Sequence, residues 1–182
     1  MNIKIVGTNS SNKIKLIKPT NEHKSQVLAY REEFLTSKES IDGSSGLANY
    51  SIYENWLKAV NDCVNKETVP EGLVPALTFL AMTSDEQLIG MINIRLELND
   101  YLFNFGGHIG YSIRKSERRQ GYAKEMLGLA LEECRKLNLE RVLITCDQDN
   151  IGSAKTILHN GGILENEVVE GDNVTQRYWI NL

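Results

Sequence analysis

Residues 113–124 read Ile-Arg-Lys-Ser-Glu-Arg-Arg-Gln-Gly-Tyr-Ala-Lys, and they join an expected strand over residues 108–113 to an expected helix that begins near Gly121. Beyond this loop, apolar residues recur at steps of three and one: Ala123, Met126, Leu127, Ala130, Leu131, Cys134 and Leu137. Such spacing places them on one face of an amphipathic helix. The segment therefore predicts a strand, a basic loop and a long helix in direct succession.

The start of this helix has the properties of a phosphate-binding site. The first amides of a helix lack partners within it, and the helix dipole is positive there. Gly121 leaves room for a ligand to approach the backbone, and Ala123 keeps the next position small. Residues 114–124 hold five Lys or Arg and one Glu, a local charge of 5 − 1 = +4. The alternative is solvated surface, although a basic cluster at a helix start opposes the dipole.

Strands and helices are expected to alternate along the chain. Sequence patterns predict strands at residues 1–7, 13–18, 77–82, 87–96, 108–113, 141–146 and 176–180, and helices after Thr20 or Asn21, over about 51–60, from about 121, and over 153–160. Without the short N-terminal strand the order is β-α-α-β-β-β-α-β-α-β. That order describes an α/β domain with a mixed central sheet and flanking helices.

Composition indicates one globular domain over residues 1–182, with 41% hydrophobic and 24% charged residues. The net charge of 20 − 24 = −4 argues against binding of nucleic acid through a basic field. No apolar run approaches the ~20 residues that span a membrane, and no signal peptide is visible, so a cytoplasmic location is expected. Cys63, Cys134 and Cys146 are expected to be free thiols, and no His/Cys cluster suggests a metal.

The basic loop and the segments after it resemble the GNAT superfamily of acyl-CoA-dependent N-acyltransferases. Residues Arg118 to Ala123 match its signature Q/R-x-x-G-x-G/A, and the similarity continues through Asn150-Ile151-Gly152-Ser153 to Gly161-Gly162. The clear similarity covers about residues 107–165. It implies an N-acetyltransferase that moves the acetyl group of acetyl-CoA to an amine of a small molecule or peptide, without a metal. Residues 13–100 would then be the acceptor-side half, and residues 101–182 the acyl-CoA-binding half.

The resemblance also implies which residues contact coenzyme A. In the family, the loop amides cradle the pyrophosphate, and the strand over 108–113 binds the pantetheine arm where it diverges from strand 141–146. The residues in these positions are Tyr111, Ser112, Ile113, Arg118, Arg119, Gln120, Gly121, Tyr122, Ala123, Lys124, Asn150 and Ser153. For Asn150 the alternative is a plain helix cap, and for Ser153 a plain residue of the first helical turn.

Two positions depart from the family pattern. Many relatives carry a tyrosine on the last helix, where it protonates the departing coenzyme A thiolate, and this position corresponds to Ile157. A general acid contributes ~10²–10⁴-fold, yet a thiol with a pKa of ~8.5 is a tolerable leaving group without one. The second departure is Lys115, which replaces a common proline and is expected to affect loop rigidity alone.

Acetyl transfer also requires a proton acceptor, because an amine with a pKa of ~10.4 is protonated at pH 7. The first candidate is His108, at a strand position where many relatives carry glutamate, and its alternative role is a structural hydrogen bond. Asp147, Glu97 and Tyr178 are weaker candidates. Cys146 ends the strand beside the thioester slot, but direct attack needs no acyl-enzyme.

The sequence does not identify the acceptor. The loop over residues 36–47 and the aromatic residues Tyr50, Tyr53 and Trp56 are candidates to line its site, with core packing as the alternative for Trp56. Acidic residues in the first half suit a cationic amine or are solvated surface. A coenzyme-A-binding regulatory module without turnover is the competing function, and a homodimer is a candidate assembly.

Overall fold

The computed structural model describes residues 12–182, so the strand predicted at residues 1–7 lies outside the described residues. The chain forms, in order, β1 (Ile14–Ile17), α1 (Lys24–Ser37), α2 (Tyr53–Asp62), β2 (Ala76–Thr83), β3 (Leu88–Arg95), β4 (Ile109–Ile113), α3 (Tyr122–Lys136), β5 (Arg141–Asp147), α4 (Ile151–His159), β6 (Ile163–Glu170) and β7 (Asn173–Asn181). The predicted α/β order is confirmed, and β6 is an additional strand that the sequence patterns did not reveal.

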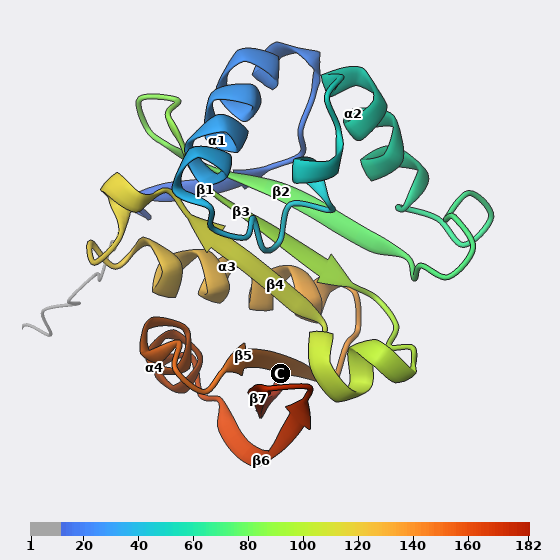
Figure 1. The fold of residues 1–182 in the computed structure, drawn as a ribbon, viewed down its shortest axis with the longest axis vertical. Coiled ribbons are helices and arrows are strands. Elements are labelled where there is room, and N and C mark those ends of the chain that lie inside the picture. The colour runs from blue at the N-terminus through green and yellow to red at the C-terminus, as the bar shows by residue number, and fades with distance from the viewer. Residues whose placement is uncertain (1–11) are drawn as a thin grey trace, which may run out of the picture.

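The strands form two antiparallel sheets, with strand orders β1-β2-β3-β4 and β5-β7-β6. Figure 1 shows α1 and α2 over one face of the first sheet, and α3 on its other face, between that sheet and α4. The sheets meet where the His108 amide donates to the Leu143 carbonyl at 2.7 Å. Tyr111 of β4 comes three residues after His108, and it lies near Cys146, which comes three residues after Leu143 on β5. The strands β4 and β5 therefore run in the same direction. This pair completes the predicted mixed arrangement.

The core has two parts, and α3 anchors the larger one. On the predicted apolar face of α3, Met126, Leu127, Ala130, Leu131 and Cys134 are all buried against β-strands of both sheets. The second part lies between the first sheet and the helices α1 and α2. Burial of these faces fixes where α3 begins, and so fixes the position of the loop before it.

Three further observations concern the described part of the chain. None of its helices is long and apolar enough to cross a membrane. All three cysteines are free and buried, which confirms the predicted free thiols. Within residues 12–182, no group of three or more His, Cys, Asp or Glu is placed to hold a metal ion.

Candidate functional site

A cleft of about 1170 Å³ lies between β4, the start of α3, the ends of β5 and α4, and the 36–47 loop. Most of the residues predicted to contact coenzyme A line it: Tyr111, Ser112, Ile113, Arg118, Arg119, Gly121, Ala123, Lys124, Asn150 and Ser153. Two of the predicted contacts do not. The Gln120 side chain donates back to Ser116 and Glu117, and Tyr122 lies beside Lys13 on another surface. The structure thus brings the sequence motifs together at one cleft.

A row of backbone amides without protein acceptors lines one end of the cleft. The Arg118 amide bonds back to Lys115, and the Glu125 amide is the first to bond along α3, to Gly121. Among the described residues, no group accepts a hydrogen bond from the amides of residues 119–124. Arg119 (φ 64°) and Gly121 (φ 88°) both have left-handed backbone conformations. Such successive turns of the backbone create a concave, anion-binding surface.

The charge near these amides is lower than the sequence suggested. Arg114 Nε lies 3.0 Å from Glu33 of α1, and Arg118 forms an ion pair with Glu39 just beyond α1. Two of the five basic side chains are therefore matched by carboxylates that are distant in sequence. Arg118 and the exposed Arg119 and Lys124 line the cleft, so the amides still lie in a basic environment.

The edge of β4 that faces β5 is the second feature of the cleft. In an antiparallel pair, residues alternate between bonding the neighbouring strand and pointing away from it. The Arg114 amide donates to Ile89 of β3, so the even-numbered residues of β4 bond β3. The amides of Ile109, Tyr111 and Ile113 consequently face β5, and within residues 12–182 no group accepts from them. This free edge is suited to bind an extended chain of amides, such as pantetheine.

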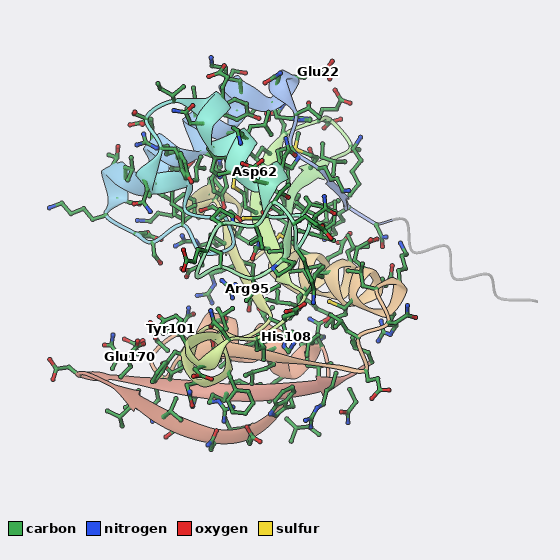
Figure 2. All side chains as sticks on the ribbon, turned by 90° about the vertical axis from the view of Figure 1, so that its right-hand side faces the viewer. Glu22, Asp62, Arg95, Tyr101, His108 and Glu170 are labelled. Atoms are coloured by element: carbon green, nitrogen blue, oxygen red, sulfur yellow. The ribbon has the colours of Figure 1, made fainter. Side chains whose placement is uncertain are left out.

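His108 closes the narrow end of the gap between β4 and β5. Its ring is 8% exposed, and its Nδ1 accepts the Leu143 amide at 2.9 Å. It is not among the residues that line the cleft, and Figure 2 shows it between the two sheets. Burial lowers the pKa of His108 to about 4, so the ring is neutral at pH 7. These contacts favour the structural alternative and do not place the predicted base at the cleft.

His108→Gln is expected to retain turnover and coenzyme binding, because a glutamine oxygen can accept the Leu143 amide in place of Nδ1. The folded-state pKa lies below the ordinary ~6.5, so the unfolded chain binds an extra proton between these values. Unfolding of the wild-type protein by urea should therefore show a stability loss of about 2 kcal/mol between pH 7 and pH 5 that the variant lacks. A large loss of turnover in folded His108→Gln would restore the catalytic role.

The other predicted candidates for proton acceptor or nucleophile lie either in the cleft or away from it. Glu97 pairs with Lys66 and Tyr178 donates to Gln176 at 2.7 Å, and neither lines the cleft. Cys146 does line it, but burial raises the pKa of its thiol to about 11, which leaves little nucleophilic thiolate at neutral pH. Asp147 lines the cleft at the end of β5.

Ile157 is fully buried in the core beneath α4. Ile157→Ala is therefore expected to lower the free energy of unfolding by about 2–5 kcal/mol while turnover per folded molecule stays unchanged. Urea unfolding and rates normalised to folded protein measure the two quantities. A fall in normalised turnover at unchanged stability would contradict this assignment.

The far end of the cleft holds two carboxylates, Asp42 and Asp147, together with one guanidinium and two aromatic side chains. Asp42 lies in the 36–47 loop, which packs on β4 so closely that a Cβ on Gly43 would meet the Gly110 oxygen at 2.3 Å. The Ser112 hydroxyl donates to the Asp42 carbonyl at 2.6 Å and fixes the loop. The protein atoms around its carboxylate, and to a smaller extent the charge of Asp147, raise the pKa of Asp42 above its usual range, whereas a hydrogen bond from Ser40 and the charge of Arg95 act in the opposite direction. The residue is exposed at the cleft.

Residues that the sequence analysis did not select complete this end. Arg95 donates to the carbonyls of Gly106 and Gly107 at 2.7 and 3.0 Å, and Tyr101 and Phe105 pack against each other beside it. All three line the cleft. The predicted aromatic residues Tyr53 and Trp56 are instead buried in the core under α2.

Comparison with known proteins agrees with this geometry. Residues 17–163 match the family model described as an acetyltransferase (GNAT) domain. The microcin C7 self-immunity acetyltransferase MccE, solved with acetyl-CoA and AMP, is 15% identical in sequence. The alignment covers 94% of this chain and 93% of the MccE chain, with a TM-score of 0.68. A putative ribosomal-protein-serine acetyltransferase from Vibrio cholerae is 21% identical, with coverage of 94% and 95% and a TM-score of 0.64.

The spermidine N-acetyltransferase from Vibrio cholerae, solved with CoA and spermine, is 15% identical, with coverage of 93% and 95% and a TM-score of 0.65. No curated protein matches the chain by sequence. At these identities the solved structures establish a shared fold, whereas the family match rests on the sequence itself.

Proposed function

The chain belongs to the GNAT family of acetyl-CoA-dependent acetyltransferases, and on this premise we propose that it acetylates an amine of a small molecule or peptide by direct attack on the thioester. One observation carries the proposal: the unbonded amides of residues 119–124 and the free edge of β4 line the same cleft as an acidic acceptor end. The first two features suit the pyrophosphate and pantetheine of coenzyme A, and the third suits a cation.

Pyrophosphate would bind the amides of residues 119–124, with Arg119 and Lys124 adding positive charge. Pantetheine would bind the outward amides of Tyr111 and Ile113 along β4. The thioester would then lie near the start of β4, where His108 and Leu143 close the gap. An outward amide there, that of Ile109, is placed to polarise the thioester carbonyl.

We assign the acceptor to the end formed by the 36–47 loop and β5. Asp42 and Asp147 supply two negative charges against the single positive charge of Arg95, so the three groups together are net negative and suit an ammonium group. The raised pKa of Asp42 favours it as the proton acceptor. The amine loses its proton to Asp42, directly or through water. It then attacks the acetyl carbon, the carbon–sulfur bond breaks with its electron pair passing to sulfur, and the second proton of the nitrogen passes through water to the coenzyme A thiolate. No covalent enzyme intermediate is required.

The proposal is tested by thiol release from acetyl-CoA against a panel of spermidine, short diamines and peptides with free N-termini. A parallel calorimetric titration with coenzyme A separates binding from catalysis. We expect binding and amine-dependent thiol release. Binding without release for any amine would favour the regulatory module, and absence of binding would overturn the proposal.

Cellular location and assembly are further parts of the proposal. Buried free thiols and the use of acetyl-CoA are consistent with a cytoplasmic location. A homodimer is consistent with the apolar side chains on β6, where Ile163 and Val169 are 68% and 70% exposed. Analytical ultracentrifugation of the full chain would report a dimer, and a monomer at all concentrations would contradict it.

A further inference from the structure

Two hydroxyl groups bridge β4 and α4 at the gap between the sheets. The Tyr111 hydroxyl lies 2.7 Å from the Ser153 Oγ, and both residues line the cleft. Tyr111 projects from the middle of β4, and Ser153 lies in the first turn of α4. The ring of Tyr111 therefore spans from the free edge of β4 to the helix on the other side of the gap.

Both partners are held in place by the backbone. Tyr111 is fixed by its pairing with Ile92 of β3. The Ser153 amide donates to the Asn150 Oδ1 at 3.0 Å, so Asn150 caps α4 and orients its first turn. Burial raises the pKa of Tyr111 to about 12, so its hydroxyl keeps its proton at neutral pH. Either hydroxyl can donate in the 2.7 Å contact between them, and the Tyr111 hydroxyl also donates to the Ser153 carbonyl at a longer distance of 3.4 Å. When Ser153 donates to the phenol oxygen, only that long contact competes for the Tyr111 proton.

Other groups near the gap do not provide such a donor. Ile157 is apolar and buried, and the His108 Nδ1 is occupied by the Leu143 amide outside the cleft. The thiol of Cys146, which lies beside Ser153, is a weak hydrogen-bond donor. The other hydroxyl of β4, that of Ser112, already donates to the Asp42 carbonyl, so Tyr111 is the hydroxyl of this strand that faces α4 and the gap.

We propose that the Tyr111 hydroxyl donates a hydrogen bond to the coenzyme A sulfur as it leaves, and that the Ser153 hydroxyl donates to the phenol oxygen and orients it. This inference rests on the proposed acetyl transfer. Once the amine has added to the acetyl carbon, the carbon–sulfur bond breaks and its electron pair passes to sulfur. Tyr111 stabilises that charge and retains its own proton, and the thiolate takes through water the second proton that the nitrogen loses as the amide forms. A donor aimed at developing charge strengthens as the charge grows.

Tyr111→Phe keeps the ring and removes the donor. We expect kcat to fall by about 10²-fold, the loss typical of one such donor, at an unchanged calorimetric Kd for acetyl-CoA. Ser153→Ala leaves the donor in place and should cost about 10-fold or less. Tyr178→Phe is the matched control, because the Tyr178 hydroxyl bonds Gln176 away from the cleft, and it should leave kcat unchanged.

A change of leaving group distinguishes a catalytic role of Tyr111 from a structural one, because a structural defect would lower kcat equally for every leaving group. A selenolate leaves more readily than a thiolate, so acetyl-seleno-coenzyme A should restore most of the rate of Tyr111→Phe relative to wild type. If Tyr111→Phe loses the same fraction of the wild-type rate with acetyl-CoA and with acetyl-seleno-coenzyme A, the inference is overturned. Wild-type kcat in folded Tyr111→Phe, or a larger loss of kcat in Ser153→Ala than in Tyr111→Phe, would overturn it as well. If wild type itself binds acetyl-CoA but transfers nothing, the proposed function fails, which is a different result from a defect confined to the variant.

Discussion

Replacing Gly121 with asparagine is expected to weaken coenzyme A binding strongly while the chain remains folded. Gly121 has a φ of 88°, and no atom lies within 4 Å of a Cβ built on it. Asparagine tolerates this left-handed conformation better than most residues, so the fold should persist. Its side chain would enter the open space in front of the amides of residues 119–124. Calorimetric titration should show a Kd raised by about 100-fold or more, a loss of roughly 2.7 kcal/mol.

The chain offers a matched control at Gly161. This glycine also has a φ of 88° and open space at its Cβ, but it follows α4 and does not line the cleft. Gly161→Asn therefore carries the same backbone strain without the steric block. It should bind coenzyme A as the wild-type protein does. Normal binding by both variants would show that the phosphates lie elsewhere.

Asp42→Asn is expected to lower kcat/KM for the amine by about 10²-fold or more, because an amide neither accepts the proton nor attracts the ammonium group. Binding of acetyl-CoA should be unchanged, since Asp42 lies at the acceptor end of the cleft. Asp85→Asn, in the turn between β2 and β3, is the control and should leave both quantities unchanged.

The pH dependence tests the same assignment. As pH falls through the pKa of Asp42, its carboxylate is protonated and kcat/KM should decrease. Because that pKa is raised, the decrease should begin at a higher pH than for an exposed aspartate. The Asn variant should lack this acid limb. An unchanged limb in Asp42→Asn would assign it to another group, with Asp147 as the next candidate.

The parts of the site that could be predicted are those that local sequence determines. The apolar spacing after Ala123 fixes the buried face of α3, and the start of that helix fixes where its unbonded amides lie. The positions of β4 and β5 followed from their apolar runs for the same reason. These features depend on residues that are close in the chain, so a single sequence reveals them.

The remaining features depend on partners that are distant in sequence. The Glu33 and Glu39 carboxylates reach the basic loop because α1 packs beside it, which the sequence of the loop alone does not reveal. His108 looked like a base by its position, but its role depends on Leu143, 35 residues further along. The strand β6 was missed because nearly all of it is exposed on the sheet edge, so it lacks the buried alternation that predicts strands.

The sequence indicated the 36–47 loop as part of the acceptor site, but it did not show how that loop reaches β4 or that Arg95 lies beside it. Asp42 enters the cleft because Gly43 and Gly110 allow two backbones to touch, and neither glycine suggests the other in the sequence. Arg95 is placed there by its bonds to the carbonyls of Gly106 and Gly107.

Acetyl-CoA labelled in its acetyl group tests the central claim most directly. The wild-type protein is incubated with the label and the amine panel, and both the small products and the intact protein are analysed by mass spectrometry. Direct attack predicts that the label appears in an amide product that resists hydroxylamine, and that the protein stays unlabelled. Label on Cys146 that hydroxylamine removes, or no transfer to any amine despite coenzyme binding, would contradict the claim.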